Sequence, residues 1–199
     1  MRKQRKAKVE RRTTETTIGL AINLDGRGKS KIKTPIGFLS HMLTLFARHG
    51  LFDLELKATG DTEVDLHHTN EDIGICLGQA LQKALKDKAG IRRFGFASVP
   101  MDEALVELSL DISGRPYLAF IVNRLPFTAT GKEYSMNYLK QFLQALVNTS
   151  GITMHVEILY GEDLHHCIEA VFKALGRALR EAVSIDSRIQ GILSTKGRL

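Results

Sequence analysis

Cysteines, long apolar runs and aromatic partners for the N-terminal charges are all scarce in this sequence. The 199 residues include only two cysteines, Cys76 and Cys167, which suits a reducing compartment and argues against a disulfide framework. No window reaches about 18 consecutive apolar residues, so the sequence predicts no membrane span. No apolar segment of the kind that a signal peptide requires follows the basic start. We therefore expect a soluble cytoplasmic protein with no membrane partner.

The composition is that of a folded protein with positive charge concentrated at its front. Hydrophobic residues make up 43% and charged residues 25% of the chain, a balance that excludes wholesale disorder, and the formal net charge is +6. Seven basic residues lie among the first twelve. They could form an arm for nucleic acid, but no aromatic residue for base stacking accompanies them. We expect a solvated tail that leads into an edge strand and binds no nucleic acid.

The most informative pattern is an internal repeat. Residues 65–84 (DLHHTNEDIGICLGQALQKA) align without a gap on residues 163–182 (DLHHCIEAVFKALGRALREA), and ten of the twenty positions are identical. The segments before each copy repeat more loosely. In each unit the pattern predicts two strands, a helix, another strand and then the helix that carries DLHH. The matching ranges are strands 16–24 and 104–112, helices 36–49 and 134–149, and strands 51–58 and 152–159.

This order predicts an α+β fold of two duplicated half-domains related by a pseudo-twofold axis. Each half would be a mostly antiparallel four-stranded sheet with two helices on one face. The expected divisions are a basic tail (1–10), a first half-domain (11–92), a second half-domain (93–185) and a C-terminal segment (186–199) that contains the sequence STKG.

The two copies of His-His-x-x-Glu predict a metal site. On a helix each glutamate lies on the same face as the histidines three and four residues before it. Imidazole and carboxylate suit manganese, iron or zinc. One exposed pair of histidines would usually be surface decoration, but two gapless copies favour a function. Asp65 and Asp163 are candidates either for supporting the histidines or for capping the helices. His41 could be a core histidine, and an overlay of the halves puts Phe142 or Gln141 at its level.

Several segments, in the same order, resemble imidazoleglycerol-phosphate dehydratases. They run from about Arg11 to Leu199 and include RRTTETTIGLAINLDG, GFLSHMLTLFARHGLFDLELKATGD, both DLHH helices, MDEALVELSLDISGRPYL and STKG. The resemblance implies a ribosomal protein S5 domain 2-like fold and a lyase of histidine biosynthesis. The family's reaction removes water from D-erythro-imidazoleglycerol phosphate and gives imidazoleacetol phosphate.

The resemblance also implies roles for individual residues, with two manganese ions per active site that stabilise developing charge. The implied metal ligands are His41, His67, His68, Glu71, Gln141, His165, His166 and Glu169, where Gln141 replaces a histidine or acidic residue of the family. The implied catalytic residues are Glu15, Glu71 and Glu169. The implied substrate contacts are Glu15, His41, His49, His67, Arg93, Arg115, His165, Lys173, Ser194, Thr195 and Lys196. Among these contacts, the cationic and hydroxyl donors Arg93, Arg115, Ser194 and Lys196 suit the phosphate group.

The expected partners are a small phosphate substrate and further copies of the chain. The family assembles into an octahedral shell of 24 subunits with active sites between neighbours, so the resemblance implies a large homo-oligomer. Two other functions compete with the dehydratase. One is a binuclear metallohydrolase acting on a phosphate ester, although such enzymes usually use more acidic ligands. The other is a non-catalytic metal-binding shell protein, which would not need Glu15 or the STKG segment.

Overall fold

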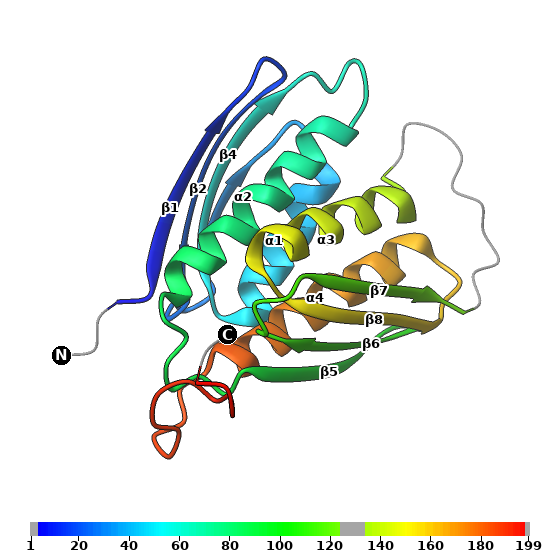
Figure 1. Ribbon diagram of the computed structural model, residues 1–199. Helices are drawn as coiled ribbons and strands as arrows, with labels where there is room; N and C mark the ends of the chain where they lie inside the picture. The colour runs from blue at the N-terminus through cyan, green and yellow to red at the C-terminus, as the bar shows by residue number, and fades with distance from the viewer. Residues whose placement is uncertain (1–3, 124–133, 198–199) are drawn as a thin grey trace.

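The computed structural model describes residues 4–123 and 134–197, and it consists of two four-stranded sheets with four helices between them (Figure 1). Arg2 and Lys3 of the expected basic tail lie outside the described residues. The elements of the first half are β1 (Lys6–Arg12), β2 (Thr16–Asn23), β3 (Ser30–Lys33), α1 (Gly37–Gly50), β4 (Asp53–Gly60) and α2 (His67–Leu85). Those of the second half are β5 (Phe94–Met101), β6 (Ala104–Asp111), β7 (Tyr117–Val122), α3 (Met136–Ser150), β8 (Thr153–Tyr160) and α4 (Leu164–Val183).

The two sheets have the same topology. Their strand orders are β1-β2-β4-β3 and β5-β6-β8-β7, and only the pairs β3–β4 and β7–β8 are parallel among the described strands. The predicted α+β class, with two mostly antiparallel four-stranded sheets and two helices per sheet, is confirmed. Each unit has one strand more before its first helix than the predicted order. In the first unit that strand is the four-residue, largely exposed SKIK, which shows no alternation for a pattern to detect.

The helices join the two halves into one core. Strand β2 alternates buried Ile18, Leu20 and Ile22 with less buried residues, and α2 covers its buried face. Across the halves, α2 packs on α3 and α1 packs on α4. Glycines permit both approaches, because a Cβ at Gly78 would lie 2.5 Å from the Leu146 carbonyl oxygen and one at Gly176 would lie 2.6 Å from that of Phe46.

The outer faces of the two sheets differ in chemistry. The first sheet exposes lysines, whereas Phe94, Phe96, Tyr117 and Ile121 are about half exposed on the second. Strand β1 begins at Lys6, so half of the segment expected to be a tail takes part in the first sheet. None of the described helices is long and apolar enough to span a bilayer.

Candidate active site

The second copy of the motif forms a cluster at the start of α4 with a histidine from α1. The Nε2 atoms of His41 and His165 lie 3.4 and 3.2 Å from Oε2 of Glu169. One potential ligand atom from each of the three residues lies within 4.8 Å of the others. The Glu169 carboxylate is buried, whereas both imidazoles are about half exposed. Two neutral imidazoles and a carboxylate at this spacing fit a divalent cation of the manganese, iron or zinc type.

Two predicted substrate contacts lie beside this cluster. The ammonium group of Lys173 lies 2.7 Å from Oε1 of Glu169, one helical turn along α4. Burial alone would raise the pKa of Glu169, but Lys173 and the two histidines outweigh burial and hold that pKa below its usual value. Burial, followed by the charges of Lys173 and Arg177, lowers the pKa of His49 at the end of α1. His49 is therefore a neutral hydrogen-bonding group near neutral pH.

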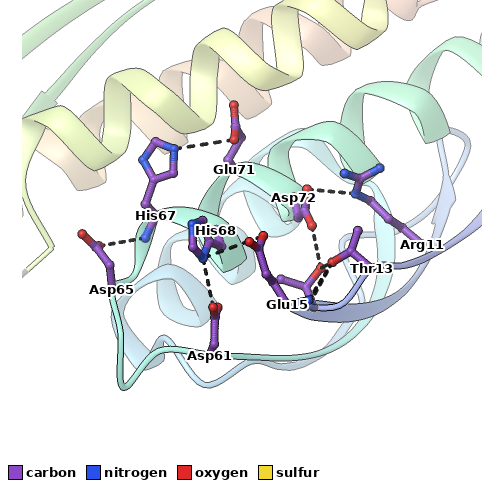
Figure 2. Close-up of polar contacts among 10 residues, drawn as sticks. Arg11, Thr13, Glu15, Asp61, Asp65, His67, His68, Glu71 and Asp72 are labelled. Carbon is purple, nitrogen blue, oxygen red and sulfur yellow. Dashed lines mark hydrogen bonds and ion pairs between the residues drawn. The ribbon is translucent and has the colours of Figure 1, made fainter.

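The first copy, at the start of α2, has the more exposed glutamate, and Figure 2 shows the contacts of its side chains. His67 Nε2 lies 3.6 Å from Glu71 Oε2, and the Glu71 side chain is 47% exposed against 10% for its counterpart Glu169. His68 points the other way and places Nδ1 3.0 Å from Asp61 Oδ2. The hydrogen bond that His68 donates to the Asp61 carboxylate is the main reason that the pKa of His68 is raised. The two histidines therefore diverge, as their 100° separation around a helix requires.

Glu15 reaches the first copy from the turn between β1 and β2. The hydroxyl of Thr13 accepts hydrogen bonds from the backbone N–H groups of Glu15 and Thr16, at 3.1 and 2.9 Å. The carboxylate of Asp72 on α2 holds this hairpin through Arg11 Nε at 2.8 Å and the Thr16 hydroxyl at 2.5 Å (Figure 2). Anchored in this way, Glu15 places Oε2 3.8 Å from Nδ1 of His68.

Carboxylates that the sequence analysis did not single out support the second histidine of each copy. Glu103 Oε2 lies 2.7 Å from His166 Nδ1, and this contact is the first cause that lowers the pKa of Glu103 to about 2. Asp61 has the corresponding contact with His68. A signal for Glu103 exists in the sequence, because it precedes the second strand of its unit as Glu15 does in the first.

Asp163 is the N-cap of α4, one of the two roles considered for it, whereas Asp65 lies just before Leu66, the N-cap of α2. Their carboxylates accept the backbone N–H of His67 and His165, at 2.9 and 2.6 Å. Asp65 also accepts a 2.5 Å hydrogen bond from the hydroxyl of Tyr138 on α3. These hydrogen bonds anchor the first turns of α2 and α4, which carry the histidines.

Both copies of the motif lie at the same end of the molecule. Phe38, at the start of α1, packs its ring 5.1 Å from the His165 ring and 5.2 Å from the Tyr134 ring just before α3, as measured between centroids. A cavity of about 550 Å³ lies between these helix starts and is lined by Leu66, Tyr134 and His165, among others. Leu66 lies just before the first histidine pair, so the cavity adjoins both copies.

Gln141 is the structural counterpart of His41. Helices α1 and α3 both end at a residue in the left-handed conformation, Leu51 (φ 55°) and Gly151 (φ 70°). When the two helices are aligned at these ends, Gln141 falls on the position of His41. The sequence alone had left Gln141 and Phe142 as alternatives. The side-chain oxygen of Gln141 is buried and accepts no hydrogen bond from any described residue.

The predicted phosphate contacts gather at the other end of the second half. Arg93, Arg115, Ser194, Thr195 and Lys196 line a cleft of about 880 Å³, together with Arg188, which the sequence analysis did not name. Arg93 donates two hydrogen bonds to the Asp111 carboxylate, one from Nε at 2.6 Å and one from Nη2 at 2.9 Å. The Arg115 guanidinium makes no hydrogen bond within the described part of the chain, so it keeps its donors for an anion.

Comparisons with known proteins agree on one family. The family model described as imidazoleglycerol-phosphate dehydratase matches residues 34–179. The chain is similar to the imidazoleglycerol-phosphate dehydratase of Geobacter sulfurreducens, with 55% identity over 98% of this chain and 99% of the relative. Identity to that of Clostridium botulinum strain Langeland is 57%, over 97% of both chains.

Solved structures show the same relationship. The crystal structure of IGPD from Pyrococcus furiosus in complex with (S)-C348 superposes with a TM-score of 0.82 at 41% identity, over 96% of this chain and 100% of that one. The enzyme structure from Staphylococcus aureus subsp. aureus N315 gives a TM-score of 0.80 at 38% identity, over 91% and 99%. The chain, with its repeated histidine motif and duplicated sheets, is therefore a member of the imidazoleglycerol-phosphate dehydratase family.

Proposed function

We propose that this protein dehydrates D-erythro-imidazoleglycerol phosphate to imidazoleacetol phosphate in histidine biosynthesis, and that the reaction depends on manganese. The observation that carries the proposal is the convergence of His165 and Glu169 on α4 with His41, which lies more than 120 positions earlier on α1, on one ligand-sized space. Curated relatives that match almost the whole chain at 55% and 57% identity bear the name of this enzyme. The two buried free cysteines are in keeping with a cytoplasmic location.

The proposed metal ions are two per active site. Bound manganese would supply positive charge that stabilises the charge developing on the substrate. The proposed ligands are His41, Gln141 and the six motif residues His67, His68, Glu71, His165, His166 and Glu169. The buried and unpartnered oxygen of Gln141 supports a ligand role. Because an amide oxygen is neutral, we expect an ion bound by Gln141 to be held more weakly than one with an imidazole or carboxylate in its place.

Glu15 is the proposed acid–base group, because its carboxylate lies beside His68 and is half exposed toward the space where a substrate would bind. Glu71 and Glu169 are proposed to act beside it as metal-linked carboxylates. The side chains of His41, His67 and His165 would also face the substrate. His49 and Lys173 lie close to Glu169. His49 would supply a neutral hydrogen-bond donor to the substrate, and Lys173 would supply a positive charge.

We further propose that a complete active site needs more than one copy of the chain. Arg93 donates its backbone N–H to the Ala182 carbonyl, which sets the phosphate cleft at the C-terminal end of α4. His165 lies near the opposite end of this 20-residue helix, about 26 Å from Ala182 at 1.5 Å per residue. No substrate built from one imidazole ring, three carbons and a phosphate spans that distance. The phosphate contacts, Arg115, Ser194, Thr195 and Lys196 included, would therefore serve a metal centre of a neighbouring copy.

The proposed assembly is the octahedral 24-mer that the resemblance implies. The half-exposed aromatic residues on the outer face of the second sheet give the chain an apolar surface that a neighbour could cover. Metal bound by ligands from several copies would couple assembly to metal content, so exhaustive chelation is expected to loosen the particle. Analytical ultracentrifugation before and after chelation tests this, and a particle of unchanged size would contradict it.

The deciding experiment strips the protein of metal, restores manganese and supplies imidazoleglycerol phosphate. Metal-dependent formation of the keto product is expected, without release of inorganic phosphate. Phosphate release would indicate the metallohydrolase instead. Glu15→Gln is expected to abolish most turnover while leaving metal binding intact, whereas a metal-storage protein would show no turnover with either variant.

A further inference from the structure

The second histidine of each motif is oriented by a carboxylate at its Nδ1 atom. The distances are 3.0 Å from His68 to Asp61 and 2.7 Å from His166 to Glu103. An ionised carboxylate only accepts hydrogen bonds, so Nδ1 must carry the proton in both rings. The Nε2 atom is then the one with a free lone pair, which is the tautomer that a metal ligand at Nε2 needs.

The two orienting carboxylates do not occupy equivalent places in the repeats. Glu103 immediately precedes Ala104, the first residue of β6, and Glu15 immediately precedes Thr16, the first residue of β2. Because β2 and β6 hold the same place in their sheets, the counterpart of Glu103 is Glu15. Asp61 lies elsewhere, in the loop between β4 and α2 (Figure 2).

Asp61 belongs to a loop that is longer in the first repeat. Gly60 and Gly161 are equivalent, because a Cβ on either would press on the residue that directly follows its His-His pair, Thr69 or Cys167. Four residues separate Gly60 from Asp65, but only Glu162 separates Gly161 from Asp163, the counterpart of Asp65. Asp61 is the first residue of this longer loop.

The two equivalent glutamates, Glu15 and Glu103, differ in how many hydrogen bonds their carboxylates accept. Glu103 accepts the backbone N–H groups of Glu162 and Asp163 at Oε1, at 3.1 and 2.7 Å, and faces His166 with Oε2. Glu15 lies 3.8 Å from His68, beyond hydrogen-bond distance, and its side chain is 50% exposed. Its two oxygens accept no hydrogen bond from any other described residue.

We infer that Asp61 is a positioning residue that orients His68 in place of the hairpin glutamate and thereby leaves Glu15 free to face the substrate. In the second repeat Glu103 itself orients His166, so that repeat has no free glutamate at the hairpin. The inference rests on the proposed function for the role of Glu15. It explains how two copies of one motif can support metal in the same way while only one of them offers an acid–base group.

The test measures manganese binding to the metal-stripped, reassembled protein by the electron paramagnetic resonance of free manganese. Asp61→Ala is expected to weaken one class of site by about 10- to 100-fold, as loss of a carboxylate behind a ligating histidine does. Glu63→Ala is the matched control, because it removes an exposed carboxylate from the same loop that makes no hydrogen bond within the described chain. Its manganese affinity should equal that of the wild type.

A double-variant cycle isolates the exchange of roles. In the wild type Glu15→Gln should leave manganese affinity unchanged, because Glu15 does not orient His68. In the Asp61→Ala background Glu15 is the nearest carboxylate to His68 and can move to its Nδ1, so Glu15→Gln should then weaken binding further. Wild-type affinity in Asp61→Ala, or an equal effect of Glu15→Gln in both backgrounds, would overturn the inference.

Asp61→Asn guards against a failure of Asp61→Ala to fold, because it keeps the size of the side chain and one oxygen acceptor. Asp61→Asn is expected to weaken manganese binding less than Asp61→Ala does, and Glu15→Gln should again weaken it further. If the effects of Asp61→Asn and Glu15→Gln on manganese affinity were simply additive, the inference would be overturned. The readout is a dissociation constant rather than turnover. A protein that fails the dehydration assay but shows the predicted coupling would therefore contradict the proposed reaction alone.

Discussion

Lys173 and Glu169 form an ion pair of 2.7 Å, one turn apart on α4, and both side chains are at least 84% buried. The first repeat has no such pair, since Ile75 stands where the second repeat has Lys173. The positive charge of Lys173 offsets the free-energy cost of burying the Glu169 carboxylate. The Glu71 carboxylate of the first repeat is exposed and is solvated by water instead.

Replacement of Lys173 by methionine should destabilise the metal-free protein by about 2 kcal/mol, because it leaves a buried carboxylate with imidazole partners only. Added manganese should reduce the difference in the free energy of unfolding between Lys173→Met and the wild type, since the cation supplies the missing positive charge. Urea unfolding with and without manganese measures both effects. Lys83→Met, which removes an exposed lysine from α2, is the control and should change stability little. Equal stabilities of Lys173→Met and the control would contradict the expectation.

Gly176→Ala and Gly78→Ala should each destabilise the fold by about 1–3 kcal/mol, because the added methyl group meets a backbone carbonyl oxygen of the neighbouring helix and, at Gly78, the Thr149 hydroxyl as well. Gly37→Ala, at the start of α1, meets nothing within 4 Å and should be neutral or slightly stabilising. Denaturant midpoints of the three variants decide this. If all three behaved alike, helix propensity rather than close packing would govern these positions.

Cys76 and Cys167 should not react with iodoacetamide at pH 8 while the protein is folded. Both side chains are fully buried, and burial raises the pKa of each thiol to about 11, so little thiolate is present. Mass spectrometry should find two alkylated cysteines only after denaturation. Thr59→Cys, on the exposed face of β4, supplies the positive control, and its added thiol should react in the folded state. Rapid labelling of the native cysteines would mean that the helices open readily.

Asp53 should make the stability of the metal-free protein depend on pH on the acid side. Its carboxylate accepts the backbone N–H groups of Arg27 and Lys29 at 2.9 and 3.1 Å, and the Arg27 hydrogen bond is the first cause that lowers its pKa. A folded-state pKa below the unfolded value gives stability that is complete above about pH 4 and is lost as pH falls through the folded pKa.

Asp53→Asn should therefore lose less stability than the wild type when urea unfolding is compared between about pH 5 and pH 3, because its amide does not titrate. Glu55→Gln is the control on the same strand, since its carboxylate makes no hydrogen bond within the described residues. The pH dependence of this control should match that of the wild type, and a matching dependence in Asp53→Asn would refute the role of the turn.

The duplication and both motif helices were predictable because they rest on local patterns. DLHH recurs with its glutamate and with the apolar periodicity of the helix behind it, and period and spacing survive without knowledge of the fold. The short parallel strand β3 was not predictable, because its four residues pair with β4 only after α1 has brought the chain back.

The partners of the histidine rings were not predictable because contact in space decides them. Asp61 lies 7 positions before His68, but Glu103 lies 63 positions before His166. Unequal loops also shift the relation between the repeats, so that Glu15 and Glu103 are 88 positions apart while His67 and His165 are 98 apart. No gapless comparison could have aligned both pairs, and the counterpart of His41 had to wait for the ends of α1 and α3.

The length of α4 underlies the proposal that each active site combines residues from two copies of the chain. If the metal end of one copy works with the phosphate end of its neighbour, two inactive proteins can rescue each other. A chain that lacks His165 still offers Arg115, and a chain that lacks Arg115 still offers His165. Assemblies formed from a mixture of the two would contain some sites that combine the sound end of each. A chain that lacks both His165 and Arg115 would restore activity to neither single variant.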